Sequence, residues 1–135
     1  MPIRNVEVEF ESSTAIVILR GEHDLDSETE LGRALASASG CRDVLVDLSE
    51  CTFLASSIVS VLLLASGRLH RHGGVLELVT PGGAGSHPIL RVLDLMGLDR
   101  LLPMHETRDA AIEYLKSARP ATLAKGARLP PAPRV

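Results

Sequence analysis

Two adjacent serines, Ser56 and Ser57, stand where an apolar strand run ends and a helical pattern begins. A hydroxyl at such a junction has two roles open to it. Its oxygen can cap the helix by accepting a free backbone N–H, which stabilises the helix by about 1 kcal/mol. It can also be phosphorylated, which places about two negative charges on an exposed surface. The residues alone leave both roles open.

Asp24, Ser56 and a histidine are also the residue types of a hydrolytic triad. Neither serine lies in the G-x-S-x-G turn that exposes the nucleophile of many hydrolases, so we do not expect an enzyme. His70 and His72 are two residues apart on a predicted helix and therefore lie on different faces. No nearby carboxylate completes a ligand set, and we interpret both as solvated cations at the helix end. The sequence predicts neither a metal site nor a cofactor.

A glycine-rich segment, residues 81–86, precedes another predicted helix. Such a segment can bind phosphate, but this one lacks the lysine of a P-loop and the spacing of a dinucleotide-binding loop. We therefore expect a flexible loop in which Ser86 caps the following helix.

The helix after the two serines must hold them in place. Apolar residues recur there at helical spacing until a basic turn and two glycines end the pattern, which predicts a helix buried along one face. Its apolar stripe consists of Ile58, Val61, Leu62, Ala65 and Leu69. Before the serines, residues 44–48 form a short apolar run typical of a strand covered on both faces. We expect this strand in the middle of the sheet.

Two further strands precede the first helix. Residues 6–10 alternate apolar side chains with glutamates, which predicts an edge strand whose buried face includes Phe10. Residues 15–19 are continuously apolar, so a hairpin opens the fold. A serine and a glutamate three residues apart, Ser27 and Glu30, suit a capping box and place the start of the first helix there.

The rest of the chain continues to alternate strand and helix. Residues 75–79 form another predicted strand, and helices are expected at residues 86–96 and 107–117. This order predicts an α/β fold with a mixed, mainly parallel sheet of about four to five strands, an N-terminal hairpin and about four helices. Residues 1–117 form one predicted domain, and residues 118–135 a disordered tail rich in proline, alanine and single basic residues.

Charge and composition exclude several classes of function. The predicted domain is acidic and has few aromatic rings, so it would bind nucleic acid poorly. No segment reaches the roughly 20 apolar residues of a membrane span, and the N-terminus carries no secretion signal. Two cysteines are too few for a disulfide scaffold and fit no zinc motif. We expect a cytoplasmic protein with reduced thiols, with no nucleic-acid or membrane partner; a homo-oligomer is not predicted.

Four segments of the chain resemble the STAS domain of bacterial anti-sigma factor antagonists. They are Gly-Glu-His-Asp at residues 21–24, the run that ends in Ala-Ser-Ser at residues 47–57, and residues 71–79 and 93–103. They occur in the family's order and at its spacing, over about residues 6–116. The resemblance implies a STAS-type α/β fold.

The resemblance also implies a partner-switching protein that regulates transcription in the stress response. In this family the unphosphorylated protein binds an anti-sigma factor, usually a serine-protein kinase of the histidine-kinase-like ATPase fold, and so frees the sigma factor. Phosphorylation of the first serine of the motif Asp-Ser-Ser-Gly-Leu-Gly ends that binding. By resemblance, Ser56 is the phosphorylation candidate. The implied partner-binding residues are Gly21, Glu22, Asp24, Ala55, Ser56, Ser57 and Ile58.

Four positions of the chain depart from that motif. Ala55 replaces its aspartate, Ile58 its first glycine, Val59 its leucine and Ser60 its last glycine. Ala55 lacks a carboxylate that would favour the helix N-terminus, and Ile58 adds a branched side chain where glycine lets a partner's backbone approach. These departures motivate an alternative function, a STAS scaffold or ligand-sensing module that is not regulated by phosphorylation.

Overall fold

An antiparallel hairpin forms one edge of the sheet. In the computed structural model, which describes residues 5–82 and 87–124, β1 (Asn5–Glu11) pairs along its length with β2 (Thr14–His23). This confirms the predicted hairpin and edge strand. Phe10, however, is 59% exposed, so its predicted burial is wrong. It lies beside the hairpin turn at a corner of the sheet, where little of the core can cover its ring.

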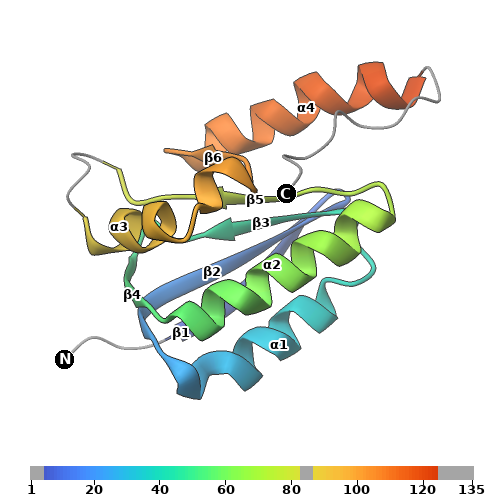
Figure 1. Cartoon of the computed structure of the whole chain (residues 1–135). Coiled ribbons are helices and arrows are strands. Elements are labelled where there is room, and N and C mark those ends of the chain that lie inside the picture. The colour runs from blue at the N-terminus through green and yellow to red at the C-terminus, as the bar shows by residue number, and fades with distance from the viewer. Residues whose placement is uncertain (1–4, 83–86, 125–135) are drawn as a thin grey trace.

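The rest of the sheet is parallel, as predicted. β3 (Asp43–Asp47) pairs with β2 on one side and with β5 (Leu76–Val79) on the other, and β5 pairs with β6 (Met104–His105). Every residue of β3 is buried, which confirms its central place. β4 (Cys51–Leu54) pairs with the end of β2, outside the main order β1-β2-β3-β5-β6 (Figure 1).

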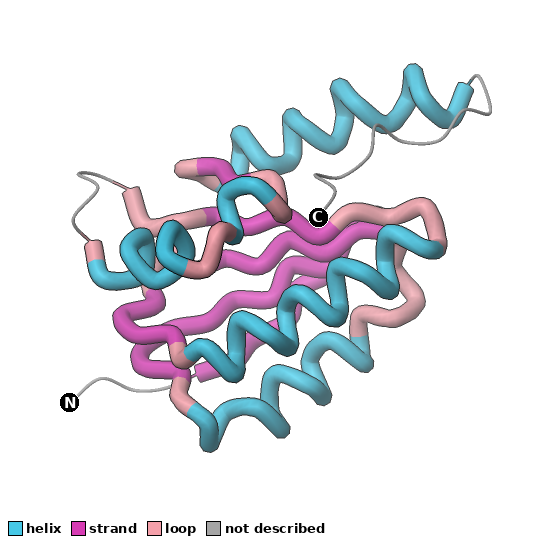
Figure 2. Tube along the Cα trace, in the orientation of Figure 1, coloured by secondary structure: helices cyan, strands magenta, loops and turns pink. Residues whose placement is uncertain are grey.

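Three helices cover one face of this sheet. α1 (Glu28–Ser37), α2 (Ser56–Arg71) and α3 (Pro88–Leu95) pack there around the main core (Figure 2). The core is aliphatic, since the chain contains only two phenylalanines, one tyrosine and no tryptophan. Its largest fully buried side chains are Leu19, Leu31, Leu48, Leu54, Ile58, Leu62, Leu76, Leu78, Ile89 and Leu93.

One helix, α4 (Arg108–Ala124), covers the other face around a smaller apolar cluster. Its first residue fastens it to the sheet, because the Arg108 guanidinium donates from Nε to Asp47 at 2.9 Å and from Nη1 to Glu9 at 3.2 Å. Beneath it, Glu77 of β5 is fully buried, and its Oε1 lies 2.7 Å from Nε2 of His105. The ionic contacts of Arg108 and the polar contact between Glu77 and His105 thus supplement a thin apolar layer on this face.

The structure corrects several predicted boundaries. The sheet has six strands rather than the predicted four to five, and the two strands that were not predicted are β4 and the two-residue β6. The backbone of α4 is helical to Ala124, so the helix extends seven residues past the predicted domain boundary at residue 117. The remainder of the predicted tail, residues 125–135, lies outside the described residues, as does Ser86.

Candidate functional site

Two loops that are distant in the sequence meet where β2 and β4 run side by side. Residues 21–23 at the end of β2 pair in parallel with β4, with a register shift after Gly21. The backbone N–H of Gly21 donates to the Glu50 carbonyl oxygen at 3.0 Å, and that of Ala55 donates to the His23 carbonyl oxygen at 2.9 Å. These contacts place the Asp24 loop directly beside the start of α2.

The start of α2 carries Ser56 as its first helical residue. Ala55 occupies the N-cap position in an extended conformation and provides no side-chain cap, so neither serine takes the capping role, one of the two that the sequence left open. The first turn contains no acidic residue. The positive end of this long helix is therefore not neutralised by a carboxylate of its own first turn.

Hydrogen bonds hold the Asp24 loop in one shape. The side chain of Asp24 accepts from the backbone N–H of Asp26 at 3.0 Å and caps the short turn η1 (Leu25–Ser27). The hydroxyl of Ser27 donates to the Asp24 carbonyl oxygen at 3.0 Å, and Ser27 makes no cap contact to α1. Ser27 is thus the N-cap residue of α1, as predicted, but it gives no side-chain capping bond, because its hydroxyl is engaged by the loop that precedes the helix.

A buried histidine supports the same loop from below. His23 is fully buried, and its Nε2–H donates to the carbonyl oxygen of Arg20 at 2.9 Å. Its Nδ1 lies 3.1 Å from the hydroxyl oxygen of Ser27. Arg20 in turn contacts the carboxylates of Glu7 and Glu50, which ties this end of β2 to β1 and to the turn before β4. The Asp24 loop is thus supported by the hydrogen-bonded side chains of His23 and Arg20.

Exposure separates the predicted partner-binding residues into two groups. Five of them reach the surface and form what we call the switch surface: Glu22, Asp24, Ala55, Ser56 and Ser57. The other two do not. Ile58 is completely buried in the main core, so its side chain is not part of this surface. Gly21 is buried as well, and its φ of 82° serves the irregular pairing of β2 with β4.

Two exposed apolar side chains border the switch surface and were not predicted as part of it. Leu25 directly follows Asp24 and is 65% exposed, and Phe53 pairs across the strands with Glu22 and is 44% exposed. Large exposed apolar side chains framed by acidic ones are typical of protein interaction sites. In the sequence Leu25 directly follows a selected residue, whereas Phe53 lies two residues before Ala55 and is brought to the site by the pairing of β2 with β4.

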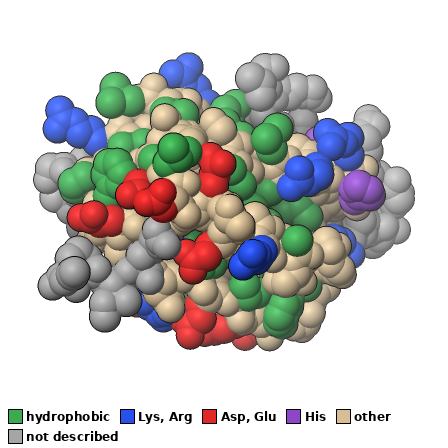
Figure 3. All heavy atoms as spheres, turned by 90° about the horizontal axis from the view of Figure 1, so that it is seen from below, with side chains coloured by type: hydrophobic (Ala, Val, Ile, Leu, Met, Phe, Trp, Pro, Cys, Tyr) green, Lys and Arg blue, Asp and Glu red, His purple; other side chains and the backbone are tan. Residues whose placement is uncertain are grey.

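The face seen from below carries an uneven charge distribution (Figure 3). Acidic side chains lie over its left and lower middle parts, with lysine or arginine side chains at the upper left and lower left margins, and a histidine with further lysine or arginine side chains lies toward its right. The start of α2 lies toward the left in Figure 1, and its basic last turn lies toward the right. The five residues of the switch surface themselves include two carboxylates, Glu22 and Asp24, and no basic side chain.

Other candidate sites give no comparable arrangement. Within residues 5–82 and 87–124, no three His, Cys, Asp or Glu side chains are grouped so that they could hold a metal ion. His70 and His72 are exposed near the end of α2, and the ring of His72 bonds to the Arg68 carbonyl oxygen at 2.8 Å. None of the helices in the described part of the chain combines the length and the apolar character needed to cross a bilayer.

Comparisons with known proteins agree with this geometry. The family model of the MlaB STAS domain matches residues 6–103. The anti-sigma F factor antagonist of Paenibacillus polymyxa is 24% identical over 120 residues, which covers 83% of this chain and 97% of that protein.

Solved structures with the same fold include two relevant relatives. An anti-sigma factor antagonist from Mycobacterium paratuberculosis has a TM-score of 0.72 and 26% identity, with 84% of this chain and 95% of that chain covered. The Bacillus cell fate determinant SpoIIAA in its phosphorylated form has a TM-score of 0.63 and 19% identity, with coverage of 82% and 99%. The matched family model spans most of the described domain, and the chain belongs to the STAS domain family.

Proposed function

We propose that this protein is an anti-sigma factor antagonist and that it binds its anti-sigma factor through the switch surface. The pairing of β2 with β4 carries the proposal, because it joins the Asp24 loop and Ser56 into one exposed patch. Relatives that match over more than four-fifths of the chain are named as antagonists of this kind. The protein would act in the cytoplasm, where sigma factors control transcription in the stress response.

The partner in this proposal is a serine-protein kinase of the histidine-kinase-like ATPase fold. Such an enzyme needs an accessible hydroxyl, and Ser56 is exposed. Its hydroxyl also makes no hydrogen bond to another described side chain that would have to break first. Ile58 does not obstruct the approach, since its side chain points into the core. Ser56 thus meets the steric requirement for in-line phosphoryl transfer.

The start of α2 would also stabilise a phosphate once it is attached. Backbone N–H groups at a helix N-terminus favour an anion, and Ala55 leaves this end without a competing carboxylate. The same phosphate would add about two negative charges beside Glu22 and Asp24, on a surface that is already acidic. We expect a partner that fits the uncharged hydroxyl to be released.

A pull-down from an extract of the source organism tests the proposed function. Wild-type protein should recover a kinase of the stated fold, identified by mass spectrometry, and Ser56→Glu should recover much less of it. Ser117→Glu, which adds the same charge on the opposite face of the sheet, serves as the matched control. Recovery of no anti-sigma factor by wild type would contradict the proposal.

One observation favours a second candidate, a STAS scaffold or ligand-sensing module without phosphorylation. A pocket lies between the C-terminal ends of α1 and α2, away from Ser56. Incubation of the protein with the recovered kinase and ATP, followed by intact mass measurement, separates the two functions. Stoichiometric phosphate on Ser56 would rule out the second candidate, and an unchanged mass would favour it.

A further inference from the structure

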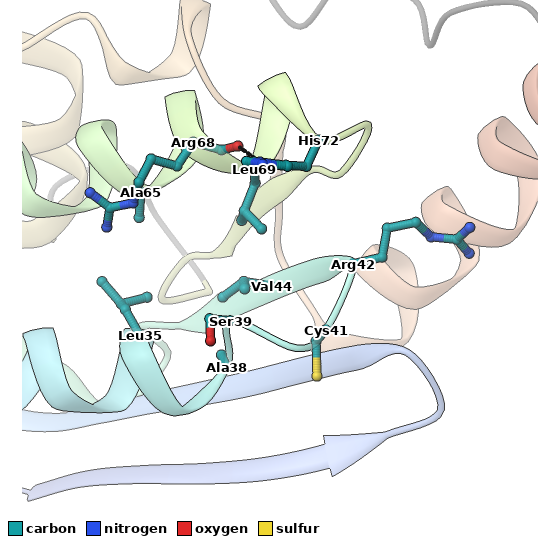
Figure 4. Close-up of a pocket in the computed structure, with 10 residues that line it drawn as sticks. All are labelled: Leu35, Ala38, Ser39, Cys41, Arg42, Val44, Ala65, Arg68, Leu69 and His72. Atoms are coloured by element: carbon teal, nitrogen blue, oxygen red, sulfur yellow. Dashed lines mark hydrogen bonds between the residues drawn. The ribbon is translucent and has the colours of Figure 1, made fainter.

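The pocket at the far end of α2 is formed by three segments. It lies between the end of α1, the end of α2 and the start of β3, and its volume is about 240 Å³. Figure 4 shows its lining residues, which are Leu35, Ala38, Ser39, Cys41, Arg42, Val44, Ala65, Arg68, Leu69 and His72. None of the switch-surface residues belongs to this set.

The walls of the pocket are mainly hydrocarbon. Leu35 and Ala38 contribute from α1, Ala65 and Leu69 from α2, and Val44 from β3. An apolar cavity of roughly 150 Å³ accepts benzene, whereas drug-sized ligands occupy roughly 300–1,000 Å³. A pocket of about 240 Å³ therefore suits a small hydrocarbon body such as a medium-length alkyl chain.

The rim of the pocket is cationic. Arg42 and Arg68 line it from different segments, and their guanidinium groups extend to opposite sides in Figure 4, that of Arg68 toward Ala65 and that of Arg42 away from the other lining residues. Long arginine stems commonly cover apolar surface while the charged group stays in water. No aspartate or glutamate lines this pocket. The rim contrasts with the chain as a whole, whose net charge is −3.

The two arginines are available for an anion. Among the described residues, Arg68 has no side-chain partner, and Arg42 has only Asp43, with a separation of 3.9 Å from Nε to Oδ2. The carbonyl oxygens at the end of α2 already accept hydrogen bonds from backbone N–H groups of the following turn and from the ring of His72. They are therefore not the partners of the two guanidinium groups.

We propose that this pocket binds a small amphiphilic monocarboxylate. Its hydrocarbon body would lie between α1 and α2, and its carboxylate at the rim would accept hydrogen bonds from Arg68. The proposal is independent of the switch surface and of any anti-sigma factor, so it stands or falls without the proposed function.

Protection of Cys41 from alkylation reports directly on occupancy. Cys41 lines the pocket and is partly exposed, whereas Cys51 is buried elsewhere. The full-length protein would be treated with iodoacetamide in the presence of octanoate, octanol or octylamine, which share one chain length and differ in the polar group. Octanoate should slow alkylation of Cys41 saturably, by about fivefold or more, and the other two should slow it much less.

Two substitutions locate the carboxylate contact. Arg68→Gln should raise the octanoate concentration needed for half-maximal protection about tenfold, while Arg91→Gln, which removes an exposed arginine of α3, should leave it unchanged. Absence of protection by octanoate would overturn the proposal. Equal protection by octanol or octylamine, or full protection in Arg68→Gln, would overturn it too, because the cationic rim would then have no role.

Discussion

The backbone N–H of Ala55 donates a hydrogen bond to the carbonyl oxygen of His23 at 2.9 Å. This single contact joins the N-cap of α2 to the residue that precedes Asp24. Because His23 is itself buried and bonded to Arg20, the loop and the helix start are held by one rigid support. In the proposed complex, a partner that contacts Ser56 would find the Asp24 loop already fixed beside it. This preorganisation lowers the entropic cost of binding.

Leu25 and Phe53 should anchor the partner. The double variant Leu25→Ala/Phe53→Ala should lower the affinity for the anti-sigma factor at least tenfold, because buried apolar anchors dominate interface energetics. Titration calorimetry with the purified partner measures this. Phe10→Ala is the matched control, since Phe10 is an exposed aromatic at the opposite end of β2. If the control and the double variant weaken binding equally, the assigned surface is wrong.

The contact between Asp47 and Arg108 should make stability depend on acid pH. Burial raises the pKa of the Asp47 carboxyl, but hydrogen bonds from Ser49 and Arg108 outweigh it and hold the pKa below its usual value. An unfolded aspartate has a pKa of about 3.9. The stabilisation is therefore complete above that pH and is lost as the pH falls toward the lower pKa of the folded state.

Denaturant unfolding of Asp47→Asn tests this expectation. At pH 7 the variant should be less stable than wild type by about 1–2 kcal/mol, a value reduced because Arg108 is partly exposed. The difference should shrink as the pH falls below about 4. Asp94→Asn, an exposed position on α3, should show no such trend. A difference that stays constant from pH 7 to the acid limit would contradict the assignment.

Gly74 should be intolerant of any side chain. A Cβ atom at this position would lie 1.9 Å from the carbonyl oxygen of Arg42, so backbone would have to move. Gly74→Ala should lower the free energy of unfolding by about 3 kcal/mol. Gly32→Ala is the control, because a Cβ there meets no atom within 4 Å and alanine favours the α1 helix by roughly 1 kcal/mol. Wild-type stability of Gly74→Ala in urea titration would refute the close approach.

The two thiols should differ in reactivity. Burial raises the pKa of Cys51 to about 11, so at pH 8 it is almost entirely a protonated thiol inside the core. Cys41 is partly exposed. Native protein should therefore react with one equivalent of Ellman's reagent, and denatured protein with two. Peptide mapping should place the native label on Cys41, and rapid labelling of Cys51 would show that the core is open.

The sequence predicted those parts of the fold in which a hydrophobic pattern extends over several residues. The alternation in β1, the apolar run of β3 and the helical stripe of α2 each repeat over several residues. β4 buries only its two end residues and β6 is two residues long, so neither shows a continuous apolar run or a clear alternation. Their strand character arises from pairing with β2 and β5, which is a property of the folded chain.

The candidate site, like the fold, was predicted only where local sequence patterns define it. The position of Ser56 at a strand-to-helix junction followed from local patterns, whereas its neighbour Asp24 was selected by family resemblance. For Ile58, the local pattern and the family resemblance led to opposite predictions. Its place on the apolar stripe of α2 indicated burial, the motif comparison placed it on the surface, and the structure buries it completely. The pocket beside Arg68 could not be predicted, because three distant segments meet there.

The affinity of the purified anti-sigma factor for Ser56→Glu tests the central claim most directly. Titration calorimetry would compare wild type, Ser56→Glu and the control Ser117→Glu, whose added charge lies on α4 across the sheet. The switch surface predicts equal binding by wild type and the control, and at least tenfold weaker binding by Ser56→Glu. Binding of Ser56→Glu with wild-type affinity would contradict the account.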